Sequence, residues 1–127
     1  IFSELSPRPH DTGMVTLGHT TNLSEFELHF RAVMGLPIAG IHLEHAGASA
    51  VILSPSETND PLPYNFVDAL KEDRTRIRIF GKEEAHVGRR MGVVLCYGEV
   101  ADGTDQLREK AKRLAATVLG TDPYMKK

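Results

Sequence analysis

The hydrophobic pattern is clearest in the second half of the chain. Residues 75–80 alternate polar and apolar side chains, which predicts a strand with one exposed face. Residues 91–100 form a longer apolar run that indicates a second strand. Apolar residues then recur at helical spacing over 104–119, and Gly120 marks the predicted end of this helix.

Shorter patterns precede these elements. The apolar run 48–53 predicts a strand that stops at Ser54-Pro55. Residues 56–63 are polar and contain prolines, so we expect a surface loop there. Residues 65–70 suit a short helix. The predicted order of this part is therefore β-α-β-β-α.

A further helix is predicted between residues 22 and 35. Asn22 is the expected N-cap, and Glu25 stands three residues later at the capping-box position. Gly35 and Pro37 supply the usual C-terminal stop. The apolar stripe of this helix consists of Phe26, Phe30 and Val33.

The N-terminal segment is predicted to be a strand end followed by a loop. Residues 1–5 alternate well enough to end a strand and would place Glu4 at its C-terminal end. Pro7 and Pro9 exclude both a helix and a central strand, so residues 6–13 are expected to be a loop. Together these elements indicate an α+β or mixed α/β protein, with a weakly marked boundary near residues 36–41.

Composition narrows the class of protein without naming a function. The 127 residues suffice for one domain with a real core, and a formal net charge of −2 gives no electrostatic reason to expect nucleic acid or an anionic membrane as partner. Cys96 is the only cysteine and lies in an apolar run, so we expect a buried, inert thiol. The sequence contains neither a membrane-spanning run nor a signal-peptide pattern, and we expect a cytoplasmic location.

The N-terminal loop carries the densest chemistry. Glu4 could coordinate a hard cation such as Mg²⁺, and Arg8 could clamp a phosphoryl group with its planar guanidinium. His10 and Asp11 follow directly. The alternative is a surface Glu–Arg pair in a turn stiffened by prolines.

A second cluster combines Lys82 with the tandem pair Arg89-Arg90. Gly81 ends one predicted strand and the arginines open the next, so three cations could converge on a phosphate monoester. The alternative is a solvated hairpin that Glu83 and Glu84 partly neutralise.

The histidines suggest a metal site only weakly. His42 and His45 are three residues apart, but they lie in a stretch without a helical stripe. A zinc site needs three or four converging ligands, so this pair alone does not predict one.

The loop sequence also resembles a known family. The stretch "SELSPRPHDTGMVTL" (3–17) resembles the metal-binding strand and loop of the ATP-grasp enzymes of purine biosynthesis, in particular the formate-dependent phosphoribosylglycinamide formyltransferases. The stretches "LSEFELHFRAVMGLP", "ASAVILS" and "RIRIFGKEEAHVGRRMGVVL" agree in the same order. The resemblance covers nearly the whole chain and corresponds to the C-terminal third of such an enzyme.

The resemblance implies both a reaction and residue roles. These enzymes use ATP, formate and Mg²⁺ to formylate phosphoribosylglycinamide through formyl phosphate. Glu4 matches a Mg²⁺ ligand, Arg8 a catalytic arginine that stabilises the acyl phosphate, and Asp11 a residue that contacts the ribonucleotide. The residues that match the phosphate-binding cluster are Lys82, Arg89 and Arg90.

The resemblance also implies an architecture. Residues 1–36 would complete an ATP-grasp domain, and residues 37–127 would form a small β-rich C-terminal domain with a packed terminal helix. The complete enzyme is expected to be a homodimer, and this chain alone is expected to be inactive. Two rival interpretations are the ATPase subunit of phosphoribosylaminoimidazole carboxylase, which typically has Asn at the position of Asp11, and a non-catalytic domain that binds a phosphorylated metabolite.

Overall fold

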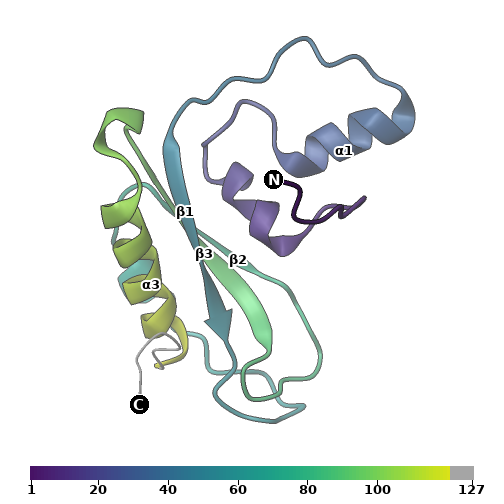
Figure 1. Cartoon of the computed structure of the whole chain (residues 1–127). Coiled ribbons are helices and arrows are strands. Elements are labelled where there is room, and N and C mark those ends of the chain that lie inside the picture. The colour runs from purple at the N-terminus through teal and green to yellow at the C-terminus, as the bar shows by residue number, and fades with distance from the viewer. Residues whose placement is uncertain (121–127) are drawn as a thin grey trace.

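The computed structural model describes residues 1–120 and contains a three-stranded antiparallel sheet with a long helix packed on it (Figure 1). The strand order is β1-β3-β2, so β3 is central. The elements of this unit are β1 (Ala46–Leu53), α2 (Val67–Leu70), β2 (Thr75–Ile79), β3 (Arg90–Gly98) and α3 (Asp105–Leu119). Their order confirms the predicted β-α-β-β-α succession and the α+β class.

Burial along the strands explains their sequence patterns. β1 buries every second residue, whereas β3 is buried almost continuously because it has a neighbour on each side and is covered on both faces. The half-exposed character predicted for β2 is also confirmed.

The main core lies between the sheet and α3. Ile52 and Val94 from the sheet meet Leu114 and Val118 from the helix, and all four are at most 1% exposed. Each such side chain contributes about 1.5–3 kcal/mol by leaving water. The apolar residues at helical spacing in 104–119 are therefore the residues that α3 buries against the sheet.

Cys96 lies in the same core, as its apolar neighbours predict. Burial raises the pKa of its thiol, and a hydrogen bond from the Thr75 side chain opposes that shift in part. The thiol is therefore kept neutral and protected from solvent.

The opposite face of the sheet is covered by the N-terminal part of the chain. The short 3₁₀ helix η1 (Asp11–Leu17) contacts β1 and β3, and α1 (Glu25–Met34) contacts η1 (Figure 1). α1 ends as predicted, with Gly35 in the left-handed region at φ 66°. Its N-cap, however, is Ser24, which accepts a hydrogen bond from Glu27 N–H, and not Asn22. The side chain of Asn22 instead holds residues 40 and 42 of the following loop.

Two predictions for the N-terminal segment are wrong. Residues 1–5 do not form a strand. They pair with none of the strands in residues 1–120, so they lack the hydrogen-bonded neighbour that a strand needs. The predicted loop 6–13 ends at His10, whose side chain caps η1 by accepting a hydrogen bond from Thr12 N–H.

The apolar stripe predicted for α1 is not buried. Phe30 and Val33 are 57% and 70% exposed, and α1 has no buried residue. A second short 3₁₀ helix, η2 (Val100–Asp102), precedes α3. Among the helices of residues 1–120, none combines the length and apolarity that a membrane span requires.

Candidate functional site

An open pocket of about 510 Å³ lies where η1 and α1 meet the ends of β2 and β3. It brings together three of the six site residues predicted from sequence, although they come from distant parts of the chain. Its lining consists of Pro9, His10, Asp11, Met14, Phe26, Phe80, Lys82 and Arg90. The pocket therefore combines two cations and a carboxylate with an apolar wall.

Asp11 and Arg90 form an ion pair across 79 residues of sequence. One guanidinium nitrogen, Nη1, donates to both carboxylate oxygens of Asp11, at 3.0 and 3.1 Å. Within residues 1–120 the other nitrogens of Arg90 make no further polar contact. Arg90 therefore keeps guanidinium donors that Asp11 does not occupy.

A register shift in the sheet turns Arg90 toward this pocket. β1 and β3 pair regularly as far as Ile52 with Gly92, but Leu53 then pairs with Arg90 and skips Met91. Val94 faces α3, so strict alternation would turn Arg90 toward α3 as well. The extra residue reverses that direction, as β-bulges commonly do beside functional sites.

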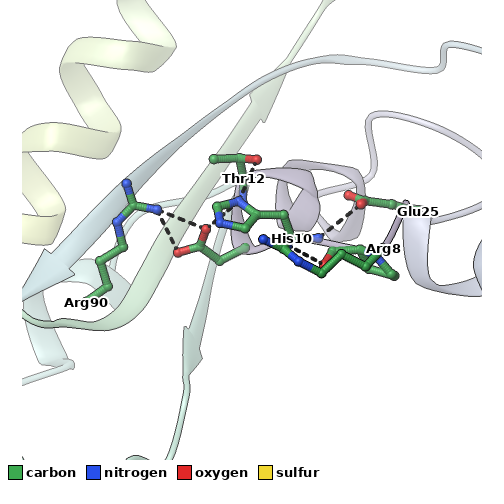
Figure 2. Close-up of polar contacts among 7 residues, drawn as sticks. Arg8, His10, Thr12, Glu25 and Arg90 are labelled. Atoms are coloured by element: carbon green, nitrogen blue, oxygen red, sulfur yellow. Dashed lines mark hydrogen bonds and ion pairs between the residues drawn. The ribbon is translucent and has the colours of Figure 1, made fainter. Parts of the chain in front are cut away.

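His10 extends the polar side of the pocket. Its Nδ1 lies 2.9 Å from Asp11 Oδ1 and 3.1 Å from Thr12 Oγ1, and it also accepts the Thr12 N–H (Figure 2). In the neutral tautomer with Nδ1 unprotonated, His10 caps η1; when Nδ1 carries a proton, it donates to Asp11. His10 thus connects the start of η1 to the Asp11 carboxylate.

Lys82 lines the main pocket and two other pockets. Its ammonium is 5.5 Å from the centre of the Phe80 ring, and one of the other two pockets, of about 350 Å³, also contains Arg89. Arg89 lines only the smaller pocket, where its guanidinium donates to the Glu84 carbonyl. The predicted cluster of three cations is therefore divided into two pairs that share Lys82.

Glu4 and Arg8 lie outside these pockets. Arg8 donates only to the neighbouring Pro9 carbonyl, and its side chain is exposed (Figure 2). Glu4 is exposed and makes no polar contact within residues 1–120. The described part of the chain contains no group of three or more His, Cys, Asp or Glu side chains that could hold a metal ion. Glu4 is thus an isolated carboxylate and does not form a metal site by itself.

The histidines of the 40–47 segment have local partners. His42 N–H donates to Asn22 Oδ1, and His45 Nδ1 lies 2.8 Å from the His19 carbonyl. The rings of His19 and His45 also pack against Tyr97. These contacts attach the segment to the fold.

Glu25 is a residue near the site that the sequence pattern did not reveal. Its carboxylate accepts the His10 N–H, although the pattern suggested only a capping role (Figure 2). The one available signal was the nearby Gly13, whose lack of a side chain leaves room for this carboxylate.

Comparison with known proteins supports the family resemblance of the sequence. The family described as "PurT, C-terminal" matches residues 47–118. The formate-dependent phosphoribosylglycinamide formyltransferase of Bacteroides thetaiotaomicron is 60% identical over 118 residues, covering 92% of this chain and 30% of that protein. This chain therefore spans about 30% of the length of that curated relative.

Similar folds occur in solved structures, including the following two. N5-carboxyaminoimidazole ribonucleotide synthetase from Thermotoga maritima gives a TM-score of 0.73 at 27% identity, over 88% of this chain and 30% of that one. The phosphoribosylaminoimidazole carboxylase ATPase subunit from Aquifex aeolicus gives 0.68 at 25% identity, over 88% and 32%. With the family match covering more than half of the sequence, the chain belongs to the PurT C-terminal family.

Proposed function

We propose that this chain is the C-terminal third of a formate-dependent phosphoribosylglycinamide formyltransferase of purine biosynthesis. The observation that carries the proposal is the 60% identity to an enzyme of that name over 92% of the chain. The pocket lined by Asp11, Lys82 and Arg90 supports it, because it offers groups of both signs to a zwitterionic ribonucleotide.

We assign residues 1–36 to the end of an ATP-grasp domain and residues 37–127 to the small C-terminal domain. The family match to residues 47–118 lies entirely within the second part and supports the division. The exposed apolar side chains of α1 are also consistent with packing against a larger domain. The complete enzyme is proposed to be a cytoplasmic homodimer.

The proposed reaction proceeds in two steps. Formate oxygen first attacks the γ-phosphorus of ATP, giving formyl phosphate and ADP. The glycinamide amine then attacks the formyl carbon, and the C–O bond to phosphate breaks. The products of this second step are the formyl amide, inorganic phosphate and a proton. Phosphorylation is needed because formate itself has no adequate leaving group.

Lys82 and Arg90 are proposed to bind the 5′-phosphate of the ribonucleotide, with Arg89 assisting from the adjoining pocket. Arginine suits this role because its guanidinium presents several N–H donors in a fixed plane. Asp11 is proposed to accept a hydrogen bond from the glycinamide amine. Binding would thus replace the Asp11–Arg90 ion pair by two contacts to one substrate.

Glu4 and Arg8 are proposed to act at the ATP end of the reaction. Glu4 would provide one carboxylate to Mg²⁺, which neutralises charge on the nucleotide phosphates when bound. By the family resemblance, a second carboxylate is proposed to come from the upstream part of the complete enzyme. Arg8 would stabilise charge on the acyl phosphate, and its exposed side chain can turn toward a partner domain.

The main rival is the carboxylase ATPase subunit. One of the two solved structures described above is such a subunit, and its fold is similar to that of this chain. The higher identity to the formyltransferase, 60% against 25–27%, favours formate as the co-substrate. The identity of Asp11 also favours the formyltransferase, because the carboxylase ATPase subunit typically has Asn at this position. The third interpretation, a non-catalytic phosphometabolite-binding domain, needs only Lys82, Arg89 and Arg90.

Steady-state kinetics of the full-length enzyme test the phosphate assignment. Arg90→Ala and Arg89→Ala are expected to raise the KM for the ribonucleotide about tenfold or more and to leave the KM for formate nearly unchanged. Arg78→Ala is the matched control, because this exposed arginine donates to the adjacent Ile77 carbonyl and does not line the main pocket. Equal effects on both KM values would contradict the assignment.

A further inference from the structure

Glu25, the first residue of α1, lies against the loop that carries Asp11. We propose that Glu25 is a positioning residue for the ribonucleotide pocket, and that Gly13 is its necessary partner. The proposal rests on the function proposed above for its kinetic consequence, but its structural part can be tested without activity. Glu25 does not line the pocket and is partly buried, so it acts through the backbone of the loop.

The Glu25 carboxylate contacts the loop at two places. Oε1 accepts the His10 N–H at 3.1 Å (Figure 2). Oε2 occupies the space beside Gly13, where a Cβ would lie only 1.0 Å away. Any side chain at position 13 would therefore displace the carboxylate from its place.

The backbone of Glu25 fixes the same loop a second time. Its N–H donates to Thr16 Oγ1 at 2.9 Å, and that hydroxyl donates to the Gly13 carbonyl at 2.7 Å. The start of α1 thereby anchors residues 10, 13 and 16. A carboxylate is also favoured at this position by the helix dipole.

These hydrogen bonds fix the backbone on both sides of Asp11, since they involve residues 10, 13 and 16. The Asp11–Arg90 ion pair has a nitrogen–oxygen distance of 3.0 Å. It forms only if the start of η1 stays at its present position relative to β3. A misplacement of about 1 Å in such a group can cost about 100-fold in rate. Removing Glu25 should therefore weaken use of the ribonucleotide although no pocket atom is lost.

The first test is kinetic and uses the full-length enzyme. Glu25→Ala is expected to raise the KM for the ribonucleotide about tenfold without changing the KM for formate. Glu25→Gln should be milder, because its amide oxygen can still accept the His10 N–H. Glu27→Ala is the matched control, since Glu27 lies in the same helical turn but pairs with Arg31. A ribonucleotide KM unchanged in Glu25→Ala overturns the proposal.

A double variant separates positioning from general damage. Gly13→Ala should impair the enzyme because its methyl group collides with the Glu25 carboxylate. In the Gly13→Ala, Glu25→Ala double variant the collision is absent, so the KM should equal that of Glu25→Ala alone. Effects that multiply in the double variant would show that the two residues act independently, which overturns the proposal.

Hydrogen exchange of the 127-residue chain gives a readout that does not depend on activity. The His10 amide should exchange about tenfold faster in Glu25→Ala and at the original rate in Glu27→Ala. Unchanged exchange in Glu25→Ala overturns the anchor even if the enzyme formylates as proposed. If the enzyme does not formylate, the proposed function fails, while this exchange measurement still decides the anchor.

Discussion

Asp11 and Arg90 neutralise each other at the pocket, so a ligand that binds one must compete with the other. Asp11 is only 18% exposed in its side chain, whereas Arg90 is 47% exposed. A partly exposed pair of this kind stabilises the fold by about 1 kcal/mol or less. The pair is therefore weak enough to be exchanged for contacts with a substrate that carries an amine and a phosphate.

Asp11→Asn tests this exchange in the full-length enzyme. The amide keeps the size of the side chain but loses the charge, so the KM for the ribonucleotide should rise about tenfold. Inorganic phosphate should at the same time inhibit more strongly, because Arg90 no longer has a competing carboxylate. Weaker inhibition by phosphate would contradict the exchange.

Cys96 makes a second prediction at the scale of single residues. Burial raises the pKa of its thiol above the ordinary 9.0, so above that pH the unfolded chain loses the proton before the folded one does. The free energy of unfolding should therefore decrease as pH rises beyond 9.0 toward the raised value. Denaturant titrations should show a steeper alkaline decrease for the natural protein than for Cys96→Ala; parallel curves would contradict this.

Helices α1 and α3 show what the hydrophobic pattern can and cannot predict. Both have an apolar stripe at helical spacing, and both were predicted. The stripe of α3 packs on the sheet, but that of α1 is exposed within the described chain. Periodicity indicates that a face is apolar, and it does not indicate which partner covers it.

Paired substitutions measure this difference. In the 127-residue chain, Leu114→Ala on α3 should reduce the free energy of unfolding by about 2–5 kcal/mol, because it leaves a cavity in the core. Phe30→Ala on α1 should change it by about 0.5 kcal/mol or less, since its side chain is 57% exposed. Chemical denaturation of both variants gives the comparison, and a large loss in Phe30→Ala would show that α1 is packed within this chain.

The strands show a similar division between predictable and unpredictable features. β2 and β3 were predicted because alternation and an apolar run reflect one covered face and two covered faces. The register shift beside Met91 has no signal in the composition of the strand, yet it turns Arg90 toward Asp11. The strand predicted for residues 1–5 failed for a related reason, since alternation does not provide a pairing partner.

At the scale of the whole molecule, the site residues divide into two groups. Asp11, Lys82 and Arg90 share one pocket, whereas Glu4 and Arg8 do not line it, and the side chain of Arg8 donates a hydrogen bond only to the Pro9 carbonyl. The sequence resemblance predicted all of these residues, but only the fold shows which of them are assembled within residues 1–120. The second group needs the rest of the proposed enzyme.

The chain by itself is therefore expected to be inactive. It should neither hydrolyse ATP nor formylate the ribonucleotide, because a single exposed carboxylate, Glu4, does not hold a metal–nucleotide complex. A coupled assay for ADP release from the 127-residue protein checks this. Formate-dependent ADP release by the isolated chain would contradict the division of the site.

The most direct test of the whole account is ADP release by the full-length protein with two substrate pairs. One pair is formate with phosphoribosylglycinamide, and the other is bicarbonate with aminoimidazole ribonucleotide. Turnover is expected with the first pair only. Turnover with the second pair would identify the carboxylase-type enzyme instead, and no turnover with either would favour the non-catalytic binding domain.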